Sequence, residues 1–143
     1  MTDRVRIAIV GSGPAGLSAA ARAAALGLSH VLIEKADHLC DTIFKYQKGK
    51  HVMATPSNLV LRADLDFDAG QREGILGTWD EQIAAGKVSV RLNADVAEIA
   101  GENGNFTLSL AGGETIQAEA VILAIGTQGN PNRLQCPDRK SVV

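Results

Sequence analysis

Two features near the amino terminus have residue types and a spacing that suit ligand binding. One is the glycine-rich hexapeptide at residues 11–16, and the other is Glu34, which Lys35 follows. Glycine lets a backbone come close to a bound group because it has no Cβ, and a carboxylate accepts hydrogen bonds from hydroxyl groups. A pyrophosphate suits the first feature and a ribose the second. The two features together therefore predict a dinucleotide site.

The elements around these residues agree with that prediction. An apolar run over residues 5–10 precedes the hexapeptide, an alanine-rich stretch over 14–26 follows it, and a second apolar run over 31–33 ends at Glu34. This order predicts a strand, a tight turn, a helix and a strand. A lone glycine-rich hexapeptide is also compatible with an ordinary turn. The strand before it, the helix after it and the distal acid favour the dinucleotide site.

Each residue type in the hexapeptide has a physical role in such a site. Gly11 lets the chain leave the strand, Gly13 lets the backbone approach a pyrophosphate, and Gly16 lets the helix pack closely on the strands. Pro14 fits near the start of the helix, where its missing N–H would have no intrahelical partner. The helix then directs free N–H groups and its positive dipole end at the phosphates.

The composition of the whole chain excludes several classes of protein. Its 143 residues suit one domain, and 45% hydrophobic and 21% charged residues with a net charge of -2 indicate a soluble globular protein. The chain has no basic footprint for nucleic acid and no predicted signal peptide or membrane anchor, so we expect a cytoplasmic protein. Cys40 and Cys136 form no Cys-x-x-Cys pair, so we expect reduced thiols and no metal site.

The middle of the chain is predicted to be less regular. Residues 36–66 suggest loops and short pieces, in which Phe44, Tyr46 and His51 either lie near a flavin ring, with Lys48 on an anion, or form a solvated loop with aromatic anchors. A helix is predicted over 67–85, with Asp66 or Asp68 as N-cap and Gly86 as the stop. Trp79 in this helix is predicted to be a core anchor.

The last third of the chain changes to the period of strands. Alternating runs over 88–92, 96–99 and 106–110, separated by glycine and asparagine turns, predict a small antiparallel β-meander. The continuous apolar run over 120–125 predicts a parallel strand buried on both faces. It ends in a turn at Gly126, at the carboxyl end of the strand, where open α/β sheets bind ligands.

The hexapeptide and this last motif together resemble a family of flavoproteins, the FAD- and NAD(P)H-dependent oxidoreductases related to thioredoxin reductase and the flavin monooxygenases. The matching stretches are residues 11–16, 34–35, 94–96 and 124–127, followed by Pro131. The spacing from Gly16 to Glu34 also resembles the FAD fingerprint more than that of NAD. The resemblance implies an incomplete α/β, Rossmann-like FAD-binding domain over residues 1–134, with a parallel sheet, flanking helices and the β-meander.

The resemblance also implies a function and a set of site residues. FAD is the expected cofactor, and NAD(P)H is the expected co-substrate of a full-length enzyme that passes hydride through flavin to an acceptor. In the family, the residue at the position of Val96 contacts the adenine through its backbone, and the glycine at the position of Gly126 lies close to the cofactor. The expected cofactor-binding residues are Gly11, Ser12, Gly13, Pro14, Ala15, Gly16, Glu34, Lys35, Val96, Ala124 and Gly126.

The chain also departs from the family pattern. Relatives place a second, NAD(P)H-binding βαβ unit after the motif at Gly126, and some have a cysteine pair that Cys40 alone does not match. We therefore assign no disulfide reduction. Residues 135–143 show no strand or helix pattern, so we expect them to be a non-native tail on a truncated reading frame, with the isolated chain inactive.

Two other functions remain open at this stage. One is an NAD(P)-binding module with Glu34 on the ribose, and the other is a non-catalytic dinucleotide-sensing or interaction domain. The expected partner is a small-molecule cofactor, with neither nucleic acid nor membrane, and a homodimer remains open for the full-length protein.

Overall fold

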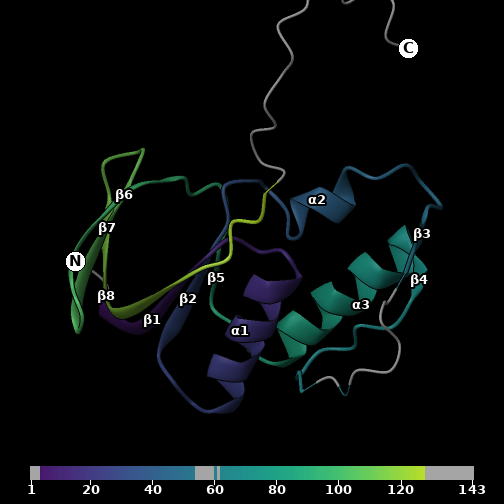
Figure 1. The fold of residues 1–143 in the computed structure, drawn as a ribbon, viewed down its shortest axis with the longest axis horizontal. Helices are drawn as coiled ribbons and strands as arrows, with labels where there is room; N and C mark the ends of the chain where they lie inside the picture. Colours follow the sequence, from purple (N-terminus) through teal and green to yellow (C-terminus); the bar gives the residue numbers. More distant parts are fainter. Residues whose placement is uncertain (1–3, 54–59, 61, 128–143) are drawn as a thin grey trace, which may run out of the picture.

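The computed structural model describes residues 4–53, 60 and 62–127. Its elements are β1 (Arg4–Val10), α1 (Pro14–Ala25), β2 (His30–Ile33), α2 (Asp41–Phe44), β3 (His51–Val52), β4 (Gly70–Gln71), α3 (Arg72–Ala85), β5 (Val90–Arg91), β6 (Val96–Glu102), β7 (Asn105–Leu110) and β8 (Thr115–Leu123). Figure 1 shows α1 and α3 side by side next to the main sheet. This arrangement confirms the predicted α/β, Rossmann-like fold.

The main sheet has six strands in the order β5-β2-β1-β8-β7-β6. The first four are parallel to one another, whereas β7 is antiparallel to both β8 and β6. The carboxyl ends of β1, β2 and β8 meet at one edge, where the N–H of Gly11 donates to the carbonyl of Ile33 at 2.9 Å and that of Ala124 to the carbonyl of Val10 at 2.8 Å. This edge holds the hexapeptide, Glu34 and Ala124.

The core has two layers because alternate residues of a strand point to opposite faces. Ile9 of β1 and Leu32 of β2 belong to a cluster with residues of α1 and α3. Ala8 and Val31 face the other way and pack with residues of β7 and β8. Trp79, 5% exposed, belongs to the helical layer, and its indole N–H donates to the carbonyl of Asp66 at 2.7 Å, which confirms it as a core anchor.

The helix predicted over 67–85 begins later than expected. It starts at Arg72, because residues 70–71 pair with β3 as strand β4. Neither Asp66 nor Asp68 is its N-cap, so that prediction was wrong; Gln71 holds the position without a side-chain cap. The helix ends at Ala85 with Gly86 as its C-cap, which confirms the predicted stop, and Lys87 then adopts the left-handed backbone conformation, with φ of 54°.

The strand predicted over 88–92 is shorter and lies elsewhere in the sheet. Only Val90–Arg91 form a strand, and this β5 pairs in parallel with β2. It therefore belongs to the parallel part of the sheet, and the antiparallel meander consists of β6, β7 and the first half of β8. Alternation did not distinguish the two places, because an edge strand with one solvated face shows the same pattern.

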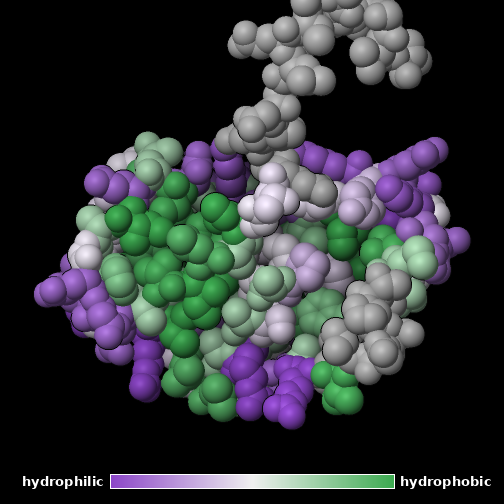
Figure 2. Space-filling model, in the orientation of Figure 1, coloured by the Kyte–Doolittle hydropathy of each residue, from purple (hydrophilic) through white to green (hydrophobic). Residues whose placement is uncertain are grey.

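The last strand differs from the prediction in both its start and its burial. β8 begins at Thr115 and pairs with β7 through Ala118, while its pairing with β1 continues to Leu123. Ile122, Leu123 and Ile125 are 39%, 62% and 67% exposed, so the strand is not buried on both faces. Within the described residues no strand pairs with β8 beyond Ala118 on the β7 side. Figure 2 shows hydrophobic side chains gathered over this part of the molecule.

Within the described ranges, no helix has both the length and the apolar composition of a membrane span. The same ranges contain no group of three or more His, Cys, Asp and Glu side chains arranged to hold a metal ion.

We expect Gly77→Ala to stabilise the fold. Gly77 lies inside α3, and a Cβ at this position would meet no atom within 4 Å. Urea unfolding followed by Trp79 fluorescence should therefore show a free energy of unfolding raised by about 0.5–1 kcal/mol. The reverse change at an exposed position of the same helix, Ala84→Gly, should lower it by a similar amount. A decrease for Gly77→Ala would contradict the described course of α3.

Candidate functional site

The hexapeptide forms the turn between β1 and α1, and its outer glycines are required by the protein's own backbone. A Cβ on Gly11, whose φ is +102°, would overlap the carbonyl oxygen of Ala124. A Cβ on Gly16 would overlap the carbonyl oxygen of Gly11. The turn is therefore packed against the end of β8, and the helix against the turn. This contact also accounts for Ala124, whose small side chain lies next to Gly16.

Gly13, unlike Gly11 and Gly16, is not required to be glycine by contacts with the protein's own backbone. Its φ of -67° is accessible to any residue, and a Cβ there would meet nothing within 4 Å. Packing and backbone conformation in the described chain therefore do not require glycine at this position. An open space beside bare backbone is the arrangement that a bound group needs for close approach.

The helix that starts at this space is ready to bind an anion. Pro14 is its first residue, no side chain caps its N-terminus, and its first turn contains no acidic residue. The N–H groups of Ala15 and Gly16 therefore have no intrahelical partner. They add to the positive end of the helix dipole, which favours a negatively charged group such as a phosphate.

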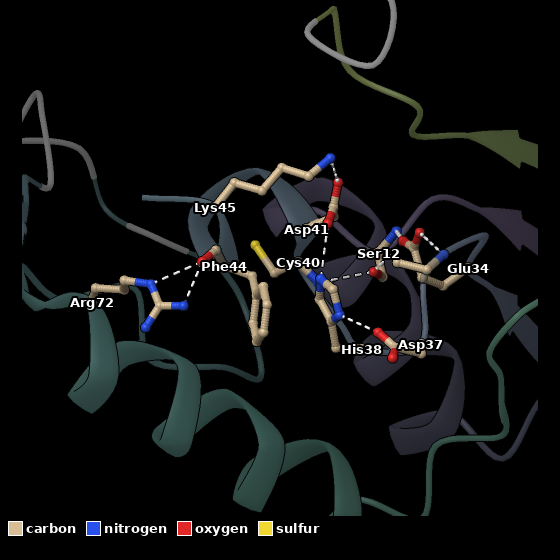
Figure 3. Close-up of polar contacts among 10 residues, drawn as sticks. Ser12, Glu34, Asp37, His38, Cys40, Asp41, Phe44, Lys45 and Arg72 are labelled. Atoms are coloured by element: carbon tan, nitrogen blue, oxygen red, sulfur yellow. Dashed lines mark hydrogen bonds and ion pairs between the residues drawn. The ribbon is translucent and has the colours of Figure 1, made fainter. Parts of the chain in front are cut away.

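Glu34 lies on the other side of the turn and already has protein partners (Figure 3). One carboxylate oxygen, Oε2, accepts from the backbone N–H of Ser12 at 3.0 Å and from the Ser12 hydroxyl. The other, Oε1, accepts from the N–H of Ala36 at 2.9 Å. Glu34 therefore holds the turn to the end of β2, in addition to any contact with a ligand.

Ser12 acts through protein contacts rather than through an exposed side chain. It is 1% exposed, and its hydroxyl donates to Glu34 and accepts from the N–H of Cys40 at 2.9 Å. The Cys40 N–H also lies 3.1 Å from the Ser12 carbonyl oxygen. The expected cofactor-binding residue Ser12 thus connects the turn, Glu34 and the start of α2. No sequence signal indicates this connection, because a serine between two glycines is equally compatible with an exposed position.

Lys35 and Val96, two further predicted cofactor-binding residues, lie near Glu34. The Ala94 N–H donates to the Glu34 carbonyl at 2.9 Å, which brings residues 94–96 to the end of β2. Lys35 is exposed and pairs with Asp95 at 3.5 Å, and Val96 is half-buried at the start of β6.

Gly126, with φ of +63°, follows Ala124 at the same edge of the sheet. Pro131, Cys136 and the expected tail at 135–143 lie outside the described residues.

The segment before and within α2 forms a charged and aromatic cluster that the sequence did not predict. His38 contacts Asp37 at 2.5 Å through Nδ1 and Asp41 at 2.8 Å through Nε2, and its ring stacks on Phe44 at 3.6 Å. Burial lowers the pKa of His38, but its two carboxylate partners outweigh burial and leave the pKa raised. The pKa of Asp41 is lowered, chiefly by Lys45 and further by His38.

The aromatic loop that follows is held by the first turn of α3. The guanidinium of Arg72 donates to the carbonyl of Phe44 at 3.0 Å, and Glu73 accepts from the N–H of Gly49 at 3.1 Å. Lys50 lies 4.3 Å from the centre of the Tyr46 ring. Phe44 ends α2 and is 43% exposed, whereas Tyr46 is partly buried and packs against the core cluster of α1 and α3. The proximity of Phe44, Tyr46, Lys48 and His51 to a flavin remains a prediction.

Cys40 contacts Ser12 through its backbone N–H, and its thiol is protected by burial. It is buried and adopts a left-handed backbone conformation, with φ of 53°, which is uncommon for a residue with a Cβ. Burial raises the pKa of its thiol to about 11, and the charges of Glu34, Asp41 and Asp80 also raise it, against a smaller opposing effect of the Ile43 backbone. The thiol therefore stays protonated near neutral pH.

Part of the sequence of this chain is similar to that of curated proteins. The chain is 34% identical to a ferredoxin–NADP reductase of Gluconacetobacter diazotrophicus over 128 residues, which are 89% of this chain and 35% of that protein. The chain thus spans about a third of the length of such curated relatives.

Solved structures of flavoproteins also match this chain, and each match covers less than half of the other chain. A bacillithiol disulfide reductase from Bacillus cereus matches with a TM-score of 0.79 and 22% identity, over 97% of this chain and 45% of that one. A ferredoxin-flavin thioredoxin reductase from Clostridium acetobutylicum matches with a TM-score of 0.68 and 26% identity, over 92% and 40% of the two chains. These matches confirm the expected relation to thioredoxin reductase-like flavoproteins. The sequence model for pyridine nucleotide-disulphide oxidoreductases matches residues 5–143, and the chain therefore belongs to that family.

Proposed function

We propose that this chain is the FAD-binding domain of an NAD(P)H-dependent flavoprotein oxidoreductase. The observation that carries the proposal is the open space at Gly13, which lies beside an uncapped helix N-terminus and one strand away from the carboxylate of Glu34. A dinucleotide fits this combination because it presents a charged pyrophosphate and a ribose a short distance apart.

The residues of the chain would bind and orient the cofactor. The N–H groups of Ala15 and Gly16 would hold the pyrophosphate, and Glu34 would accept from the adenosine ribose. When bound, FAD would supply the redox chemistry, taking hydride from NAD(P)H and passing it to an acceptor. The protein's own contribution is position and electrostatic environment.

FAD is favoured over NAD(P) as the ligand of this site for two reasons. The spacing from Gly16 to Glu34 resembles the FAD fingerprint, and one solved structure that is 26% identical to the chain is a ferredoxin-flavin thioredoxin reductase. The relatives named as ferredoxin–NADP reductases support NADP(H) as the electron donor or product of the full-length protein. Absorbance of the protein after incubation with FAD separates the two ligands, because bound flavin is yellow and bound NAD is not.

We expect Gly13→Val to abolish FAD binding while the protein stays folded. The branched side chain would fill the space where the pyrophosphate should approach, and it meets no protein atom there at its Cβ. Flavin absorbance retained after gel filtration should fall to background, while the circular dichroism spectrum and the unfolding midpoint remain close to those of the parent.

A substitution at the neighbouring glycine is the matched control for this experiment. Gly16→Ala should instead lower the unfolding midpoint, because its Cβ would overlap the carbonyl oxygen of Gly11 and one of the two segments would have to shift. Equal FAD affinity in Gly13→Val and the parent would mean that the hexapeptide is only a turn.

We expect the thiol of Cys40 to be unreactive in the native protein. In a Cys136→Ser background, alkylation by iodoacetamide at pH 8 should be more than about a hundredfold slower than in urea, because reaction needs the thiolate. The native rate should increase as pH rises toward about 11, where the thiol ionises. Reaction at the rate of an unfolded chain would contradict the protected position of Cys40 and reopen a redox role for it.

A further inference from the structure

A groove with a volume of about 490 Å³ lies beside α3 and is separate from the hexapeptide. Its lining comes from residues 37–44, from α3 and from residues 88–92 around β5, and it includes neither the hexapeptide nor Glu34. Volumes of about 300–1,000 Å³ are typical of small-molecule sites. We propose that this groove binds a small amphipathic cation, an apolar body that carries one ammonium group, independently of the proposed dinucleotide site.

The walls of the groove are mainly aliphatic. Six apolar side chains from three parts of the chain line it, and they are Leu39, Leu76, Ile83, Val88, Val90 and Leu92. All of them except Ile83 are only partly buried, so water still reaches part of this apolar surface. Covering such a surface with an apolar group is favourable because it removes both from water. The walls therefore suit the apolar part of the ligand.

One acid interrupts this apolar surface. Asp80 lies one turn of α3 after Leu76 and one turn before Ile83, on the same face of the helix, and it lines the groove. Partial desolvation raises the pKa of Asp80 and outweighs the opposing effect of the His38 charge. Because a partly desolvated carboxylate is stabilised by an opposite charge next to it, Asp80 suits the ammonium group of the ligand.

The other ionisable groups at this end of the groove already contact one another. Asp37 and Asp41 both contact the imidazole of His38, and Asp41 also pairs with Lys45 (Figure 3). With His38 protonated, these two acids and two bases sum to zero charge, and with His38 neutral they are negative. Asp80 adds a negative charge in both states. The groove therefore attracts a cation and repels an anion.

The test is NMR titration of the ¹⁵N-labelled 143-residue chain at pH 7.5 with three probes of similar shape, 3-phenylpropylammonium, 3-phenylpropanol and 3-phenylpropanoate. The ammonium should bind about three- to tenfold more tightly than the alcohol, because it adds one partly desolvated ion pair, and the carboxylate should bind most weakly. Amide shifts should change along residues 76–84 and 88–92. Equal affinity for the ammonium and the alcohol, no saturable binding of the ammonium, or shifts confined to other residues would overturn the proposal.

Two substitutions on α3 separate charge from shape. Asp80→Asn keeps the size of the side chain and removes its charge, so the ammonium and the alcohol should then bind equally. The matched control Glu81→Gln removes a charge from the next residue, which does not line the groove, and should keep the preference of the parent. A preference for the ammonium that survives in Asp80→Asn would overturn the role of Asp80.

A third substitution tests the position of the site. Ala84 lines the groove and is exposed, so a larger side chain there can occupy the groove without entering the core. Ala84→Phe should weaken binding of both the ammonium and the alcohol by at least about tenfold, while the circular dichroism spectrum stays that of the parent. Unchanged affinities in this variant would place the probes elsewhere and overturn the proposal. None of these outcomes depends on FAD binding, so they leave the proposed function to its own test.

Discussion

The close contact of three backbone segments at one edge of the sheet is the constraint on which the site depends. The turn at Gly11, the start of α1 at Gly16 and the end of β8 at Ala124 approach so closely that a Cβ on either glycine would overlap a carbonyl oxygen. This contact fixes the direction of α1 and therefore the direction of its free N–H groups. Under the proposed function, binding of an anion at this helix N-terminus would thus be a consequence of backbone packing and would need no charged side chain.

A second group of interactions connects this contact to the rest of the domain. Glu34 joins the end of β2 to the turn, and Ser12 joins Glu34 to the start of α2 at Cys40. Because these links are hydrogen bonds of buried or half-buried groups, loss of one partner leaves another unsatisfied. Glu34→Ala would for this reason affect stability as well as ligand affinity, which the sequence alone, with Glu34 as a simple ribose acceptor, did not indicate.

The predictions succeeded where spacing along the chain determines the structure. The βαβ unit is local, so the strand at 5–10, the helix from Pro14 and the position of Glu34 were all predictable. The start of α3, the place of β5 and the exposure of Ile122 depend instead on which distant strands pair. The same reason explains the missed contacts of Ser12 with Cys40 and of Arg72 with Phe44, which join residues 28 positions apart in each case.

Under the proposed function, the nature of the site would explain how one kind of domain can serve different reactions. Its principal contacts with a dinucleotide would be backbone N–H groups of α1 and one carboxylate, so few side chains need to be retained for cofactor binding. The relatives of the chain accordingly include proteins named as ferredoxin–NADP reductases and one named as an indole-3-pyruvate monooxygenase. Burial raises the pKa of the Cys40 thiol to about 11, so this thiol is protonated near neutral pH. Under the proposed function, the choice of acceptor would therefore depend on residues other than those proposed to bind the cofactor.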